Sequence, residues 1–267
     1  PYTTLSDLFL EPGQTLLTAS YYWGPYKTLA DEGDRRIATF RMFDERGRLD
    51  LADFERALFA RIEAEGRALI FLNSPCNNPT GYSFDDDEWK GIVDIVGRAA
   101  DRGPVTLVLD MAYARYGASE LGPSLDRLLQ LAGKVLLLFA WSASKSFTAY
   151  GLRVGALVAV HPDATVRSSV QNALTFACRG TWSTCNAGGM VAVTRLLVEP
   201  ELRARVERER GGELSGRTGE IRRIDTRRAR PPLARKRSSA SRTGPVVEPQ
   251  VSTAMSPSPS MSAQCVP

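Results

Sequence analysis

The chain has 267 residues, 43% of them hydrophobic, and its 34 Lys and Arg against 30 Asp and Glu give a net charge of +4. This length allows one large domain or two ordinary ones, with ample material for a core. No apolar stretch approaches the roughly 18 residues of a membrane-spanning helix and no basic-then-apolar leader is evident, so we expect neither a membrane partner nor a secretory signal.

The predicted elements alternate along the chain. Residues 47–67 carry apolar side chains at helical spacing, with Asp50 as a plausible N-cap. Short apolar runs that predict strands lie at 68–72, 105–109, 135–140 and 154–160. Helical patterns follow at about 85–102 and 122–132, and residues 184–210 predict a last helix. This alternation predicts an α/β fold with a mostly parallel sheet flanked by helices, whose ligand site lies beyond the C-terminal ends of the strands.

The composition changes after residue 210. Residues 211–267 contain ten Lys or Arg and four Asp or Glu, which leaves 24 and 26 for residues 1–210, so the basic character belongs to the tail. The tail has no aromatic residue and is rich in Arg, Ser, Pro and Gly. Because such a segment buries too little apolar surface to offset its ordering entropy, we predict a disordered tail.

The cysteines and the single histidine argue against a metal site. Cys76, Cys178, Cys185 and Cys265 form no Cys-x-x-Cys pair, which predicts reduced thiols in a cytoplasmic protein rather than a disulfide framework or a zinc site. His161 ends an apolar run at a turn and is expected on the surface. One histidine excludes a His-cluster site, so no metal is expected.

Polar residues that follow the apolar runs could together hold a phosphorylated aromatic aldehyde. Lys145 closes the run from residue 136, and a buried amine can form a Schiff base with an aldehyde. Asp110 closes the run 105–109, where a carboxylate could keep a ring nitrogen protonated and make the ring an electron sink. The other candidates are Tyr113 and Asn78 for a ring hydroxyl, Arg153, Ser142 and Ser144 for a phosphate, and Trp23 or Tyr22 for stacking.

In order and separation, four stretches resemble the large domain of the pyridoxal-phosphate-dependent aminotransferases of fold type I, in the aspartate/aromatic (class I/II) group. The stretches are Asn77–Gly81, Asp110–Tyr113, Ser142–Lys145 with Arg153, and Arg179–Ser183. The resemblance covers about residues 5–210. It implies a partial cofactor-binding large domain at 1–183, a helix leading towards a small domain at 184–210, and the basic tail at 211–267.

The resemblance implies roles for the residues around the cofactor ring. Lys145 resembles the lysine that bonds pyridoxal 5'-phosphate and moves the proton between the substrate Cα and the cofactor carbon. Asp110 resembles the partner of the ring nitrogen. Tyr113 and Asn78 resemble the partners of the phenolic oxygen.

The remaining matches concern the phosphate, the ring faces and the substrate. Ser142 and Arg153 resemble phosphate ligands, and Trp23 and Ala112 resemble the residues on the two faces of the ring. Arg179 falls where some members place an arginine that reaches across a dimer to the substrate's distal carboxylate. The resemblance thus implies a homodimer that transfers an amino group between an amino acid, aromatic or dicarboxylic, and a 2-keto acid.

Two departures from the family pattern lead us to expect truncation at both ends. The family's glycine-containing phosphate loop precedes a segment like Asp7–Gly13, whereas this sequence begins at Pro1. The small domain carries the arginine for the substrate's α-carboxylate, and residues 211–267 offer no candidate for it. A truncated or frameshifted gene would explain both ends, and a catalytically inactive remnant is therefore one alternative.

Other functions remain as alternatives. A pyridoxal-phosphate-dependent amino-acid lyase of the same fold would use the same residues. A cofactor-sensing half of a transcriptional regulator would carry an N-terminal winged-helix domain, which is not seen. The tail arginines lack the aromatic interleaving typical of nucleic-acid binding, so we expect no nucleic-acid partner. Ser142-x-x-Lys145 also matches penicillin-recognising acyl transferases, but their Ser-Asp-Asn and Lys-Thr-Gly companions are missing.

Overall fold

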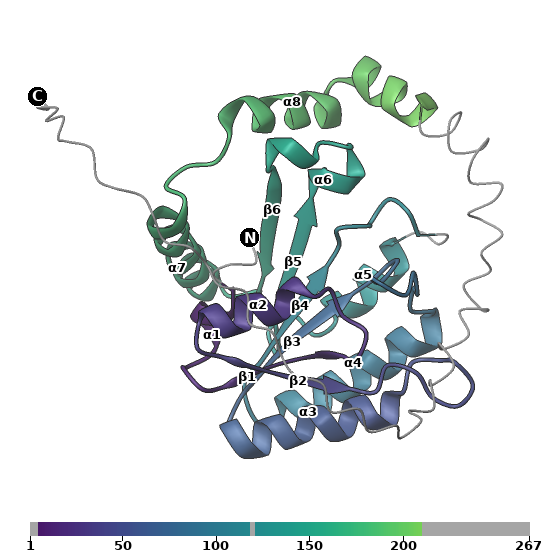
Figure 1. Cartoon of the computed structure of the whole chain (residues 1–267), viewed down its shortest axis with the longest axis vertical. Coiled ribbons are helices and arrows are strands. Elements are labelled where there is room, and N and C mark those ends of the chain that lie inside the picture. The colour runs from purple at the N-terminus through teal and green to yellow at the C-terminus, as the bar shows by residue number, and fades with distance from the viewer. Residues whose placement is uncertain (1–4, 118–120, 210–267) are drawn as a thin grey trace, which may run out of the picture. The chain divides into compact units, whose positions relative to one another are not determined.

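One six-stranded sheet organises the residues described by the computed structural model, which are 5–117 and 121–209 (Figure 1). The strand order is β2-β1-β3-β4-β5-β6. The strands are β1 Thr15–Ala19, β2 Arg36–Phe40, β3 Ala68–Asn73, β4 Val105–Asp110, β5 Leu136–Ser142 and β6 Gly155–Val160. All neighbouring pairs are parallel except β5 and β6, which are antiparallel. The predicted α/β class with a mostly parallel sheet is confirmed.

Helices connect the strands and cover both faces of the sheet. They are α1 Leu5–Phe9, α2 Pro25–Glu32, α3 Leu51–Glu65, α4 Asp86–Ala100, α5 Gly122–Leu129, α6 Ala143–Ser146, α7 Ala164–Thr181 and α8 Ala187–Val198, with a 3-10 turn at Tyr150–Leu152 and a further helical stretch at 200–209. Figure 1 shows α3 and α4 lying side by side against the sheet. None of the helices within the described ranges is long and apolar enough to cross a bilayer.

Alternation along the central strands builds two cores. On one face, Ile70 and Leu107 pack with the apolar sides of α3, α4 and α5. On the other face, Leu69 and Val108 pack with α1 and Tyr26 of α2. Because β3 is buried at every position, its sequence is continuously apolar, as is typical of parallel strands covered on both sides.

Caps fix where the two long helices begin. Asp50 caps α3 by accepting a hydrogen bond from the Asp53 amide at 3.0 Å, as predicted. At the start of α4, Asp85 and Glu88 form a capping box, in which each side chain accepts from the other residue's amide. A side-chain cap contributes about 1 kcal/mol, so these residues define the helix starts that the sequence predicts near 50 and 85.

Several elements differ from the sequence-based expectation. The helix expected at 122–132 ends at Leu129, and the one expected at 184–210 is interrupted at Glu199. The analysis of the sequence missed α1, β1, α2, β2 and α7.

Cys76, Cys178 and Cys185 are free thiols, and His161 lies just after β6 with its Nδ1 accepting from the Asp163 amide. The predicted disordered tail at 211–267 lies outside the described residues, as does Cys265.

Candidate functional site

Strand register brings the C-terminal residues of β3 and β4 to one edge of the sheet. Asn73 pairs with Asp110, so β3 and β4 end level, and Asp110 pairs with Ala140 near the end of β5, which continues to Ser142. The buried Asn73 amide donates to the Asp110 carbonyl at 3.1 Å, and its oxygen accepts from the Asn78 amide at 2.7 Å. Asn73 therefore ties the turn that carries Asn78 to the end of β4. The sequence analysis missed Asn73; its position at the end of the apolar run was the available signal.

Asp110 is a buried carboxylate at this edge, with only 3% of its surface exposed. Its Oδ1 accepts from the Ala112 amide at 2.9 Å, and its Oδ2 accepts from the hydroxyl of Tyr26. Buried carboxylates require such donors, because an unpaired buried charge is very costly. Tyr26 is fully buried near the start of α2.

The aromatic segment before α2 reaches the same edge through Tyr26. The ring of Trp23 meets that of Tyr26 edge-on at 5.7 Å, and Phe71 of β3 does so from another direction at 5.1 Å. Trp23 is half-buried. This packing links the predicted stacking residue to the Asp110 carboxylate by a chain of two contacts.

The turn after β4 connects to the short helix that carries the lysine. The half-buried ring of Tyr113 lies 6.1 Å from the exposed ring of Tyr116, at an angle of 73°. The Tyr116 hydroxyl donates to the main-chain carbonyl of Lys145 at 2.8 Å. Tyr113, a predicted partner of the ring oxygen, is thus linked through Tyr116 to the main chain of Lys145.

Lys145 lies in α6, immediately beyond β5. Ser142 caps this helix, accepting from the Ser144 amide at 3.1 Å, which leaves the hydroxyl proton available for a further acceptor. The Ala143 amide donates to the Val154 carbonyl at 3.0 Å and anchors the helix against β6. The Lys145 ammonium lies 4.4 Å from the centre of the Tyr150 ring.

Arg153 shares that ring with Lys145. Its guanidinium carbon lies 4.9 Å from the ring centre, and its Nη1 donates to the Tyr150 carbonyl at 2.8 Å. The ring is 63% exposed, so each cation–π contact is worth about 0.5–1 kcal/mol. Two cations gathered at one exposed ring give a locally positive potential, which suits an anion such as a phosphate. Tyr150 was missed in the sequence analysis, although it stands between the two basic residues.

Arg179 is not brought to this group within the chain. It is exposed near the end of α7, and its Nη1 donates to Ser183 at 2.9 Å. Among the described residues, its hydrogen bonds reach none of the other candidates. Its assignment to a substrate carboxylate stays a prediction.

A cavity of about 430 Å³ lies elsewhere, between β6 and α7. Leu157 and Ala159 line it from the strand, and Arg167 and Gln171 from the helix. None of the residues predicted from the sequence belongs to its lining. The residue chemistry at the strand ends therefore identifies the candidate site better than the cavity does.

Comparison with known proteins gives a consistent family. The model of the family described as aminotransferase class I and II matches residues 3–212. The chain is 27% identical over 194 residues to an aromatic-amino-acid aminotransferase of Pseudomonas aeruginosa, covering 72% of this chain and 46% of that protein. It is 30% identical over 207 residues to an aspartate aminotransferase of the same organism, covering 76% and 49%. The chain thus spans about half the length of these curated relatives.

Solved structures agree with the sequence relatives. An aminotransferase from Anaerococcus prevotii matches with a TM-score of 0.72 at 27% identity, over 78% of this chain and 51% of that one. An aromatic-amino-acid aminotransferase from Burkholderia pseudomallei, covalently bound to pyridoxal phosphate, matches with a TM-score of 0.70 at 26% identity, over 83% and 53%.

Proposed function

Since this chain belongs to the class I and II aminotransferase family, we propose that it is the cofactor-binding part of a pyridoxal-phosphate-dependent enzyme that moves an amino group between an amino acid and a 2-keto acid. The observation that carries the proposal is the buried Asp110 carboxylate, at the C-terminal end of β4 and tied through Asn73 to the turn of Asn78. A ligand at the carboxyl ends of parallel strands is the usual arrangement in such sheets.

The residues at this edge fit the cofactor's chemistry. A protonated ring nitrogen is the cation that a buried carboxylate such as Asp110 favours. Asn78 and Tyr113 would donate to the phenolic oxygen. The phosphate would be held by Ser142, Ser144 and Arg153, and the ring faces would be covered by Trp23 and Ala112. When bound, pyridoxal phosphate supplies an electrophilic carbonyl and an electron sink.

Lys145 would carry the reactive amine. Its Nζ would hold the cofactor covalently before substrate arrives and, once released, would take the proton from the substrate Cα and deliver it to the cofactor carbon. General-base catalysis of this kind contributes roughly 10²–10⁴-fold to a rate. Tyr116 holds the Lys145 main chain from the β4 side, which limits how far α6 can move.

The substrate and the assembly are further parts of the proposal. The relatives are named for aromatic amino acids and aspartate, so we propose one of these classes as the substrate, with Arg179 contributing to a distal carboxylate from a second copy. Apolar side chains stand exposed on two helices, with Phe176 of α7 at 83% and Val198 of α8 at 67%. Such surfaces favour association, which supports a homodimer. The free thiols support a reducing compartment, the cytoplasm.

Cofactor labelling tests the proposal. The purified chain is mixed with pyridoxal phosphate, the visible absorbance is recorded, the bond is fixed with borohydride, and the modified peptide is mapped. We expect label at Lys145 that disappears in Lys145→Ala and persists in Lys134→Ala, a surface lysine paired with Asp101. Equal labelling of many lysines would contradict the proposal. Incubation with one amino acid and one keto acid then separates amino exchange from the ammonia release of a lyase.

A further inference from the structure

A second buried carboxylate lies outside the candidate site, at the start of α4. Glu88 is 1% exposed. Its Oε2 accepts from the Asp85 amide at 2.9 Å, which completes the capping box. Its Oε1 accepts from the Tyr82 hydroxyl at 2.6 Å and from the Leu49 amide at 2.8 Å. Glu88 thus joins three segments of the chain, and the capping box accounts for only one of them.

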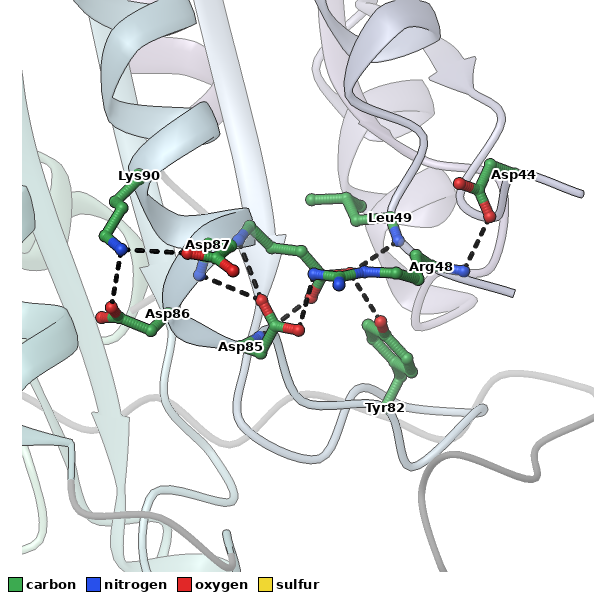
Figure 2. Close-up of polar contacts among 9 residues, drawn as sticks. Asp44, Arg48, Leu49, Tyr82, Asp85, Asp86, Asp87 and Lys90 are labelled. Atoms are coloured by element: carbon green, nitrogen blue, oxygen red, sulfur yellow. Dashed lines mark hydrogen bonds and ion pairs between the residues drawn. The ribbon is translucent and has the colours of Figure 1, made fainter. Parts of the chain in front are cut away.

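A positive charge lies beside this buried carboxylate. Arg48 pairs with Asp85 at 2.6 Å (Figure 2). It also lies 3.6 Å from Glu88. Figure 2 shows the Tyr82 side chain extending towards Arg48 and Asp85 from the loop before α4. Burial, followed by the hydrogen bond to Glu88, raises the pKa of Tyr82 far above its ordinary value. The hydroxyl therefore stays protonated, and remains a donor to Glu88, across the physiological range.

Tyr82 closes the turn that carries Asn78. Its carbonyl accepts from the Asn77 amide at 2.8 Å, and the Asn77 carbonyl accepts from the Gly81 amide at 2.6 Å. The buried Asn77 side chain accepts from the Thr80 hydroxyl at 2.8 Å and donates to the Tyr21 carbonyl at 3.2 Å. The ring of Tyr82 packs edge-on against Phe43 at 5.0 Å. The position of Tyr82 thus fixes the second half of the turn, which leads back from Gly81.

The first half of the same turn is held by the Asn73 side chain, which joins the main-chain amide of Asn78 to the main-chain carbonyl of Asp110 at the end of β4. Within the turn, Pro79 and Gly81 are exposed. Within the described residues, no hydrogen bond is made to the Asn78 side chain. The orientation of the Asn78 side chain therefore depends on the main chain of the turn, which Asn73 and Tyr82 hold at its two ends.

We propose that Glu88 is a positioning residue for the cofactor site. Through the Tyr82 hydroxyl it fixes residues 77–82, so that Asn78 is already held at the strand end that carries Asp110 before a ligand binds. The role in the reaction rests on the proposed function. The fixing of the turn is a property of the ligand-free chain and can be measured alone.

The test uses Tyr82→Phe in the full chain, which removes the hydroxyl and keeps the ring. Without cofactor, amide hydrogen exchange at Asn77, Asn78 and Gly81 should become roughly tenfold faster, because one hydrogen bond to a charged group is lost. Amides of β4 should be unchanged. The matched control is Tyr21→Phe, whose ring also packs on Phe43 and whose hydroxyl makes no hydrogen bond in the described part of the chain. Unchanged exchange in the turn, or equal acceleration throughout β4, would overturn the positioning role.

A double-mutant cycle that combines Tyr82→Phe with Asn78→Ala gives a second readout. The dissociation constant of pyridoxal phosphate, from its visible absorbance, should rise about tenfold in Tyr82→Phe and show no further rise when Asn78 is already Ala. An equal rise in both backgrounds would mean that Tyr82 does not act through Asn78. If the unmodified chain takes up no pyridoxal phosphate, the proposed function fails, whereas hydrogen exchange still decides whether Glu88 fixes the turn.

Discussion

The hydroxyl of Tyr26 donates a hydrogen bond to the carboxylate of Asp110, across 84 residues of sequence. Tyr26 is fully buried at the start of α2, and Asp110 ends β4. The bond fastens the aromatic segment with Trp23 to the strand end that carries the carboxylate. The position of Asp110 is therefore determined by contacts from outside its own strand.

Replacing Tyr26 with Phe should damage both stability and cofactor binding. The buried carboxylate loses a donor, and leaving such a group short of a partner costs about 1–3 kcal/mol. We expect urea unfolding to show a loss of this size and pyridoxal phosphate to bind roughly tenfold more weakly. Tyr21→Phe, on the same segment, should change neither measurement. Wild-type stability and affinity in Tyr26→Phe would contradict a supporting role for this bond.

Replacing Tyr150 with Leu should weaken cofactor binding more than it weakens the fold. Lys145 and Arg153 lose the ring that they share, but the ring is largely exposed and each contact is worth about 0.5–1 kcal/mol. We expect a Tm change of a few degrees and a several-fold higher dissociation constant for pyridoxal phosphate. Tyr150→Phe keeps the ring face and should match the wild type. A loss in Tyr150→Phe equal to that in Tyr150→Leu would mean that the hydroxyl, not the ring, matters.

Local signals in the sequence were sufficient for the centre of the fold. β3 and β4 are continuous apolar runs because both of their faces are buried, and α3 and α4 carry amphipathic patterns with caps at Asp50 and Asp85. By contrast, β2 is a short strand with mixed exposure that begins with Arg36. The helix α7 has no buried residue, yet Val166, Val170 and Leu174 recur every four residues, so its pattern was present in the sequence and was overlooked.

The candidate site divides in the same way. Residues at strand ends, such as Asp110 and Lys145, could be predicted from position and chemistry. The partners that hold them could not, because the Tyr26–Asp110 and Tyr82–Glu88 bonds depend on how separate elements pack. Such supporting contacts leave no periodic signal in the sequence.

Stability should show an acid-dependent contribution from Asp53. The Arg41 amide, by hydrogen bonding, lowers the pKa of Asp53, and Arg56 adds to the effect. A carboxyl whose folded-state pKa is depressed stabilises the fold above its unfolded pKa of about 4 and loses that contribution as the pH falls through the folded value. Asp53→Ala should therefore be less stable than the wild type near pH 7, and urea unfolding should show this difference shrinking towards about pH 3. A difference that stays constant with pH would contradict the ionic origin.

Thiol reactivity should separate Cys76 from Cys185. Burial raises the pKa of the Cys76 thiol, since it disfavours the thiolate more than the Ser83 hydroxyl supports it. Cys185 is exposed just before α8. Alkylation requires the thiolate, so iodoacetamide near pH 8 should modify Cys185 well before Cys76, as followed by peptide mass spectrometry. In denaturant both sites should react at similar rates, which is the control for intrinsic reactivity. Equal rates in the folded chain would mean that the turn around Cys76 opens faster than alkylation occurs, and this would also argue against a turn fixed by Tyr82.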